Sequence, residues 1–255
     1  MLTLLSPAKT LDFSPMPEGL ATTAPRFEND VEVLLARCKE LSAADLAELM
    51  SLSEPLAQLN YERFQAMRLP FTPENSKACL LAFQGDVYKR LDAGTLSRRD
   101  LEWAQDHVRI LSGLYGLLRP LDRIQPYRLE MGTRLDNERG ANLYQFWGDK
   151  LADALNEESD GAPVLNLASN EYVKAVPTDR LSSPMVTAVF QEMRDGKPKT
   201  IAFLAKKARG LMTRFVVENR IDEPEGLKDF GEEGYAFEPD LSTGDRLVFL
   251  RPDSR

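Results

Sequence analysis

Short apolar runs separated by stretches of helical periodicity organise the chain. The runs typical of buried strands are Leu2–Leu5, Cys79–Phe83, Val108–Leu111 and Val164–Leu167. Between them apolar residues recur every three to four positions, which predicts helices over Phe27–Leu41, Ala43–Met50, Glu54–Met67, Asp86–Leu91, Arg98–Asp106, Leu143–Glu157 and Ile201–Arg220. Strands alternating with helices predict a mixed α/β fold. We expect a single domain over residues 1–255, with helices around a mixed β-sheet and an order too irregular for a standard doubly wound fold.

Two local patterns add hairpins to this picture. Val186–Met193 and Lys197–Ile201 flank Asp195-Gly196, a dipeptide typical of a tight β-hairpin turn. The second pattern spans residues 42–67 and predicts two short helices, the first opened by the capping box Ser42-Ala-Ala-Asp45 and the second by Ser53 ahead of Glu54-Pro55.

The connection between those two helices, Met50-Ser51-Leu52-Ser53, alternates apolar and small residues. A helix-hairpin-helix has this alternation, and its turn offers backbone N–H groups to a DNA phosphate, but glycines usually occupy the small positions. The residues of this stretch alone therefore favour a plain αα-hairpin, with a helix-hairpin-helix as the alternative.

Three predicted strands end in residues suited to a binding site. They lead into Ser6-Pro7-Ala8-Lys9, Gln84-Gly85-Asp86 and Ala168-Ser169-Asn170-Glu171. In open α/β sheets ligands collect beyond the carboxyl ends of strands, and Ser169 could cap the next helix and leave N–H groups free. We expect a cleft in which Lys9 lies near Arg128 and the Asn166–Glu171 loop, although each loop taken alone also fits an ordinary cap or turn.

The net charge of −8 argues against a protein that binds nucleic acid through its overall charge. Binding is still possible if the cations are segregated, and from Gly196 to Val217 there is no Asp or Glu. On a helical wheel the apolar residues of this stretch share one side, and Lys206, Lys207, Arg209 and Arg214 project from the other side or its flanks. Gly210 falls within the basic side, where a missing side chain would let a backbone or a phosphate approach. We expect a phosphate-binding face, with a solvated surface helix as the alternative.

Other residue types exclude several classes of protein. Cys38 and Cys79 have no paired spacing and His107 is the single histidine, so no disulfide framework, metal site or cofactor is expected, and no catalytic triad can be assembled. No apolar run is long enough to span a membrane, and a reducing cytoplasm fits the cysteine usage. The stretch between Lys89 and Lys150 uses arginine alone as its cation; we expect most of these arginines to pair with neighbouring acids. The Gly-x-x-Gly within Ser112–Gly116 is too short a pattern to carry a function.

Longer motifs resemble one known family, the peroxide stress protein YaaA family. They are Leu5–Asp12 (LSPAKTLD), Ala82–Tyr88 (AFQGDVY), Ile110–Leu135, Leu143–Asp149 (LYQFWGD), Asn166–Tyr172 (NLASNEY) and Ala205–Met212 (AKKARGLM), in an order that covers almost the whole chain. The resemblance implies a role in oxidative stress, limiting peroxide and iron damage to DNA. It also implies a DNA-binding protein with a distinctive α/β fold, a positively charged cleft and a helix-hairpin-helix, which would fall at Gly196–Val217 and Ala43–Met67.

Three hypotheses follow. The first is a DNA-binding protein without catalysis, gripping the backbone of duplex, bubble or junction DNA with little sequence preference, through Lys9, Ser51, Leu52, Ser53, Arg128, Lys206, Lys207, Arg209 and Arg214. The second is an enzyme acting on a nucleotide or nucleic acid, with a pocket around Lys9, Glu130, Asn166, Glu171 and Lys206. The third is an interaction protein whose basic helix meets an acidic partner.

Overall fold

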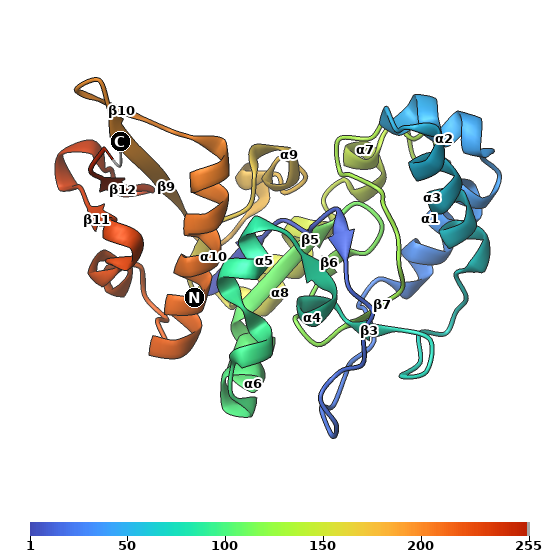
Figure 1. Ribbon diagram of the computed structural model, residues 1–255, viewed down its shortest axis with the longest axis horizontal. Helices are drawn as coiled ribbons and strands as arrows, with labels where there is room; N and C mark the ends of the chain where they lie inside the picture. Colours follow the sequence, from blue (N-terminus) through green and yellow to red (C-terminus); the bar gives the residue numbers. More distant parts are fainter. Residues whose placement is uncertain (254–255) are drawn as a thin grey trace.

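An eight-stranded mixed sheet forms the centre of the computed structural model, which describes residues 1–253 (Figure 1). Five strands run parallel, and they lie side by side in the order β5 (Val108–Ser112), β1 (Leu2–Leu5), β8 (Val164–Asn166), β9 (Met185–Arg194) and β12 (Arg246–Arg251). Antiparallel strands extend the sheet: β6 (Gly116–Leu118) pairs with β5, β10 (Lys197–Lys199) with β9, and β11 (Ala236–Phe237) with β12. Two small ribbons join β2 (Thr10–Leu11) to β4 (Phe83–Gln84) and β3 (Lys77–Ala78) to β7 (Arg123–Ile124).

The helices fall into two groups. The first group is α1 (Glu28–Lys39), α2 (Ala43–Met50) and α3 (Glu54–Ala66), which lie together at the end of the molecule remote from β11 and β12 (Figure 1). The remaining helices accompany the sheet: α4 (Cys79–Ala82), α5 (Asp86–Leu91), α6 (Arg98–His107), α7 (Leu143–Trp147), α8 (Lys150–Ser159), α9 (Asn170–Val173) and α10 (Ala202–Asn219). Short 3-10 turns cover Ala93–Thr95, Thr178–Arg180, Pro224–Asp229, Glu232–Gly234 and Pro239–Leu241. No helix of the described residues is long and apolar enough to cross a membrane.

The position of β1 decides where a site can form. All four of its residues are buried, as expected for a parallel strand covered on both faces. β5 lies on one side of β1 and β8 on the other, so the chain crosses over β1 between these two strands. In chain order the parallel strands are arranged 2-1-3-4-5, which opens a crevice beyond the carboxyl ends of β1 and β8. The antiparallel strands and the α1–α3 group distinguish the fold from a standard doubly wound sheet, and one hydrophobic core connects that group to the sheet and to α10.

The predicted mixed α/β architecture is confirmed, and two predicted elements are wrong in detail. Cys79–Phe83 is not a strand, because Cys79–Ala82 forms the short helix α4 and only Phe83 continues into β4. The helix predicted over Leu143–Glu157 is two helices, separated at Gly148, whose φ of 49° and ψ of −126° are incompatible with a continuous helix. The β-hairpin is confirmed, with positive φ at both Asp195 and Gly196.

Helix α10 packs directly on α5, and Gly210 makes this possible (Figure 1). A Cβ atom added at Gly210 would lie 2.1 Å from the carbonyl oxygen of Val87 and 2.9 Å from the Cβ of Arg90. Gly210 is therefore buried against a neighbouring helix and is not part of an exposed basic face. Of the two possibilities that the sequence left open at this glycine, the structure shows the close approach of a backbone.

The Gly-x-x-Gly stretch and the histidine are also structural. Added Cβ atoms at Gly113 and Gly116 would lie 2.3 Å from the carbonyl oxygen of Leu129 and 2.7 Å from the Trp147 ring. His107 stacks on Trp103, with ring centroids 3.8 Å apart, and its Nδ1 is 2.8 Å from the Trp103 carbonyl oxygen.

A pocket at the carboxyl ends of β1 and β8

The three loops predicted to form a site meet around one pocket of about 280 Å³. They contribute Ser6, Lys9, Gly85, Ser169 and Glu171 to its wall. Parallel pairing of β1 with β8 explains the meeting of two of these loops, because both strands end at the same edge of the sheet. The third loop arrives through the β2–β4 ribbon, which places Gln84 opposite Thr10.

Hydrogen bonds between the two strand ends hold the base of the pocket. The Ser169 N–H donates to the Ser6 Oγ at 2.8 Å, and the Ser6 hydroxyl donates to the Ser169 Oγ at 3.3 Å. The Tyr88 hydroxyl donates to the Ser6 carbonyl oxygen at 2.8 Å, and burial raises the pKa of this phenol. Ser169 does occupy the N-cap position of α9, but its hydroxyl bonds to Ser6 rather than to a helix N–H. The two serines therefore fix the loops to each other.

A carboxylate shared by two cations forms a second part of the wall. The Nζ of Lys9 lies 2.7 Å from the Oε2 of Glu130, and the Nη2 of Arg128 lies 3.2 Å from its Oε1. Glu171 lies on the same pocket; its Oε1 accepts the Gly132 N–H at 3.0 Å, and its Oε2 makes no hydrogen bond or ion pair within the described residues. The predicted proximity of Lys9 to Arg128 and to the loop after β8 is confirmed. The role of Lys9 and Arg128 in DNA binding stays a prediction.

Helix α10 supplies the cations that have no acidic partner. Lys206 and Arg209 are three positions apart, hence on one face of the helix, and both line the pocket. Arg209 is half-buried, and burial lowers the pKa of its guanidinium. Its Nε is fully buried and has no hydrogen-bond acceptor in the part of the chain that the structure describes. Among the half-buried arginines of residues 1–253, Arg209 is the one whose side chain makes neither a hydrogen bond nor an ion pair.

Comparison with known proteins identifies the family. The family model described as peroxide stress protein YaaA matches residues 1–241. The chain belongs to the YaaA family. A UPF0246 protein of Aromatoleum aromaticum is 52% identical over 98% of this chain and 99% of its own length. UPF0246 proteins of Dechloromonas aromatica (51% identical, all of both chains) and of Burkholderia mallei strain SAVP1 (52% identical, 98% of both chains) are similarly close. Membership of this family supports a role related to oxidative stress.

The other cations predicted on α10 of this YaaA-family chain are engaged elsewhere. The Nη1 of Arg214 donates to the carbonyl oxygen of Leu91 at 3.0 Å and to the Oγ1 of Thr95 at 2.8 Å, and its Nη2 lies 2.7 Å from the Oε1 of Glu218. The ammonium of Lys207 lies 4.2 Å from the centre of the exposed Phe203 ring. Arg214 thus ties α10 to the end of α5, and Lys207 stays at the surface.

The hairpin Ser51–Ser53 lies in the α1–α3 group, on the far side of the molecule from the C-terminal strands (Figure 1). The N–H groups of Ser51 and Leu52 already donate to carbonyl oxygens of α2, Leu52 to Ala47 at 3.0 Å. Ser51 has a left-handed conformation with φ of 52°, so proline cannot replace it there without changing the fold. The N–H groups of Ser53 and Glu54 have no acceptor within the described residues, and these two donors are what the turn could offer to a phosphate.

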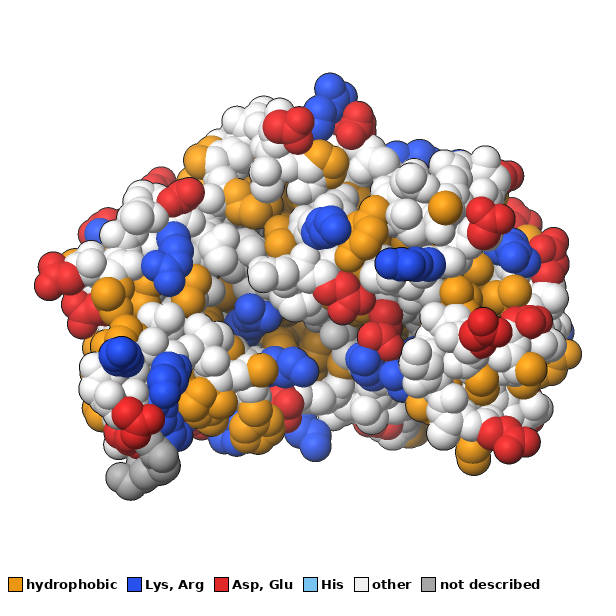
Figure 2. Space-filling model, turned by 90° about the horizontal axis from the view of Figure 1, so that it is seen from above, with side chains coloured by type: hydrophobic (Ala, Val, Ile, Leu, Met, Phe, Trp, Pro, Cys, Tyr) orange, Lys and Arg blue, Asp and Glu red, His pale blue; other side chains and the backbone are white. Residues whose placement is uncertain are grey.

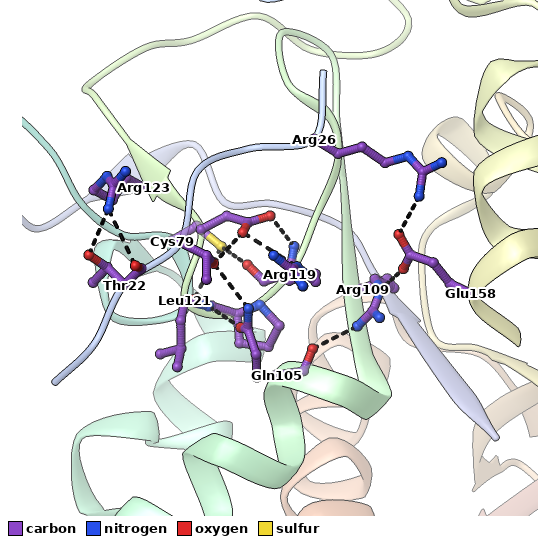
Figure 3. A network of polar contacts seen from close by, with 12 residues as sticks. Thr22, Arg26, Cys79, Gln105, Arg109, Arg119, Leu121, Arg123 and Glu158 are labelled. Atoms are coloured by element: carbon purple, nitrogen blue, oxygen red, sulfur yellow. Dashed lines mark hydrogen bonds and ion pairs between the residues drawn. The ribbon is translucent and has the colours of Figure 1, made fainter. Parts of the chain in front are cut away.

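The arginine-rich central segment of this chain is used mainly for structure, as predicted. Figure 3 shows Arg109 against Glu158, which also receives Arg26, while Arg123 bonds to Thr22. Most of these guanidinium groups are therefore paired with other groups of the protein, and few remain for a ligand.

Sequence reasoning placed Ser6 and Ser169 in loops suited to a site without giving them a role in binding, and it did not include Tyr172. Ser6 and Ser169 carried a signal, because each follows a predicted strand directly, whereas nothing in the pattern separated Tyr172 from an ordinary core residue. Asn166 does not line the pocket; its Oδ1 accepts the Ala168 N–H at 2.9 Å and its Nδ2 donates to Thr187, so it shapes the loop that carries Ser169. Residues 1–253 contain no cluster of three His, Cys, Asp or Glu side chains placed to hold a metal ion.

Proposed function

We propose that this chain acts in the response to peroxide by binding DNA through backbone phosphates at the pocket face of α10. The observation that carries the proposal is the half-buried Arg209 guanidinium, which has no acidic partner within the described residues. A buried charge without a counter-ion is costly, and a phosphate oxygen would supply both the missing charge and the missing hydrogen-bond acceptor. Lys206 on the same face of the helix adds a second positive charge for the same group.

Further cations continue from the pocket toward the α1–α3 group. Arg128 lies beside Glu130, and Arg63 of α3 lies near Arg128. Burial of Arg63 and repulsion from the Arg128 guanidinium both lower the pKa of Arg63. In Figure 2, Lys and Arg side chains surround a hollow in the middle of one face, with Asp and Glu side chains among them. Such a local group of cations would let a chain with a net charge of −8 hold a polyanion at this face.

An exposed aromatic ring favours distorted over fully paired DNA. Phe203 is 51% exposed, lies one turn before Lys206 on α10, and carries the Lys207 ammonium over its ring. Exposed aromatic rings flanked by cations stack on unpaired bases, which a regular duplex does not offer. We therefore expect bubbles and junctions to be bound more tightly than duplex of the same length.

The test is a salt titration of DNA binding by fluorescence anisotropy. Arg209→Ala and Lys206→Ala should each weaken binding to unrelated duplex sequences and flatten the plot of log K against log salt concentration by about 0.9 per lost phosphate contact. The matched control is Arg99→Ala, because Arg99 on α6 is exposed and its side chain has no partner within the described residues. Loss of Arg209 removes no internal bond, so the melting temperature should not fall. Equal affinities and slopes for Arg209→Ala and Arg99→Ala would exclude α10 as the DNA surface.

A second candidate is an enzyme acting on a nucleotide or nucleic acid. The observation in its favour is that the carboxylates of Asp86 and Glu171 lie on the same pocket as Lys206 and Arg209. Incubation with labelled DNA and nucleotides, followed by product analysis of the natural chain and of Glu171→Gln, tests this candidate. Turnover that disappears in Glu171→Gln would support an enzyme, and unchanged substrates would leave DNA binding as the function.

A further inference from the structure

The pocket beside α10 has a composition that a DNA backbone alone does not require. Its cations Lys206 and Arg209 come from α10 and Lys9 from the loop after β1, whereas the carboxylates of Asp86, Glu130 and Glu171 come from α5, from the segment after β7 and from α9. A run of phosphates would be repelled by these carboxylates. The ligand that fits must therefore carry a negative charge at one part and hydrogen-bond donors at another.

The individual polar groups define what each part of the ligand would meet. Both oxygens of Glu130 already have cationic partners, in Lys9 and Arg128. Glu171 differs, since only its Oε1 is bonded, to the Gly132 N–H. Two carboxylates can thus accept a donor from a ligand: Glu171 through its Oε2, and Asp86, whose side chain makes no hydrogen bond or ion pair within the described residues. The guanidinium that can receive an anion is Arg209.

The volume of the pocket and the rest of its wall indicate which class of ligand fits. A volume of about 280 Å³ is at the small end of the range for ligand pockets and suits one small molecule rather than a polymer. The apolar side chains of Val87, Leu167 and Tyr172 complete the wall and favour a flat, partly apolar group over a sugar alone. Gly85, with φ of 132°, keeps the wall open where its loop approaches Ala8.

We propose that the pocket accepts one nucleoside monophosphate unit, with its phosphate on Lys206 and Arg209 and a base or sugar donor on Glu171. This inference rests on the proposed function and extends it. A nucleotide unit reaches the pocket either as a nucleotide turned out of bound DNA or as a free nucleoside monophosphate. In the first case the unpaired nucleotide is the feature that the protein recognises in damaged or distorted DNA.

Isothermal titration calorimetry with the full chain tests the pocket, using 2′-deoxyadenosine 5′-monophosphate, 2′-deoxyadenosine and inorganic phosphate as probes. The monophosphate should bind with one-to-one stoichiometry and at least about tenfold more tightly than either part. Arg209→Ala should weaken the binding of the monophosphate and of inorganic phosphate alike. Glu171→Gln keeps an oxygen for the Gly132 N–H but removes the negative charge. This variant should bind the monophosphate more weakly and duplex DNA more tightly than the natural chain does.

The matched control is Glu32→Gln, because Glu32 on α1 is exposed and its carboxylate has no partner within residues 1–253; this variant should change the binding of neither ligand. Because both ligands would use Lys206 and Arg209, the source is identified by comparing two duplexes: tighter binding of a duplex with one extrahelical nucleotide than of a fully paired one, with that difference lost in Glu171→Gln, assigns the pocket to a nucleotide of DNA. Equal affinity for the two duplexes, with tight binding of the monophosphate, assigns it to the free nucleotide. Salt-sensitive duplex binding without saturable monophosphate binding would overturn this inference and leave the DNA proposal intact. Absence of both would overturn both.

Discussion

Gly210 of α10 lies so close to Val87 of α5 that a Cβ atom at position 210 would stand 2.1 Å from the Val87 carbonyl oxygen. Val87 and Arg209, the residue before Gly210, both line the pocket. The distance between these two helices therefore decides the position of the guanidinium that we propose as the anion-binding group.

Replacement of Gly210 by alanine should separate α5 from α10. Backbone atoms stand in the way of the new methyl group, so we expect a loss of about 3 kcal/mol in the free energy of unfolding measured in urea. The control is Gly244→Ala, where no atom lies within 4 Å of the added Cβ, and its stability should stay within about 0.5 kcal/mol of the natural chain. Equal stability of the two variants would mean that α5 and α10 are not in close contact in solution.

The turn between α2 and α3 can be tested with proline at Ser53. The φ of Ser53 is −66°, which proline adopts, and the N–H that proline removes has no acceptor in the described residues. If the turn grips DNA, Ser53→Pro should lower the affinity by about 1.5 kcal/mol, roughly tenfold, at unchanged melting temperature. Ser53→Ala retains the N–H and should bind as the natural chain does. Unchanged affinity in a folded Ser53→Pro variant would make this element a plain αα-hairpin.

Phe203 should discriminate between DNA forms. Phe203→Ala removes the stacking surface but no charge, so we expect binding of bubble DNA to weaken by about 1–3 kcal/mol, measured by anisotropy, with a smaller effect on paired duplex. Leu59 is similarly exposed at 41% but lies on α3, and Leu59→Ala serves as the control for lost surface hydrophobicity. An equal loss for bubble and duplex would show that Phe203 does not contact unpaired bases.

Burial of the two thiols gives a prediction for high pH. Burial raises the pKa of Cys38 from 9.0 to about 12 and also raises that of Cys79. Between these values the unfolded chain loses the Cys38 proton while the folded chain keeps it, so the folded state loses stability as the pH rises above about 9. Each proton is worth about 1.4 kcal/mol per pH unit. Denaturation curves from pH 8 to 11 should therefore decline less steeply for Cys38→Ala than for the natural chain. Parallel curves for the two proteins would contradict this.

The burial of the two cysteines also affects the reactivity of this chain toward peroxide. The thiolate, not the thiol, is the reactive form, and both thiols are buried with pKa values raised above the ordinary one. We expect mass spectrometry of the folded chain after mild peroxide treatment to show both cysteines unmodified.

The strands and helices with strong local signals were predictable from the sequence, and the failures have definite physical causes. Asp86–Leu91 and Ala43–Met50 begin and end as predicted, because the helical periodicity is clear in both and a capping box at Ser42 opens the second. Cys79–Phe83 failed because a short continuous apolar run fits a buried helix turn as well as a strand.

Part of the site was predictable for the same kind of reason. Lys9 and the Ser169 loop follow strands, and adjacent parallel strands bring their ends together. The environment of Gly210 and Arg214 was not predictable, because a helical wheel shows which residues share a face but not which neighbouring helix covers it. Only the packing of α5 on α10 separates the free guanidinium of Arg209 from the engaged one of Arg214.

The central place of β1 has a consequence for synthesis of the chain. Leu4 is synthesised long before its two neighbours in the sheet, Arg109 and Asn166. At about 5–20 residues per second, the interval between positions 4 and 166 lasts roughly 8 to 32 s. Throughout that time at least one edge of this apolar strand, the edge that β8 later occupies, stays unpaired, a form prone to wrong association. A nascent chain that lacks β8 holds the Ser6–Lys9 wall of the pocket but not the wall that follows β8, so the binding site cannot form until both strands are made.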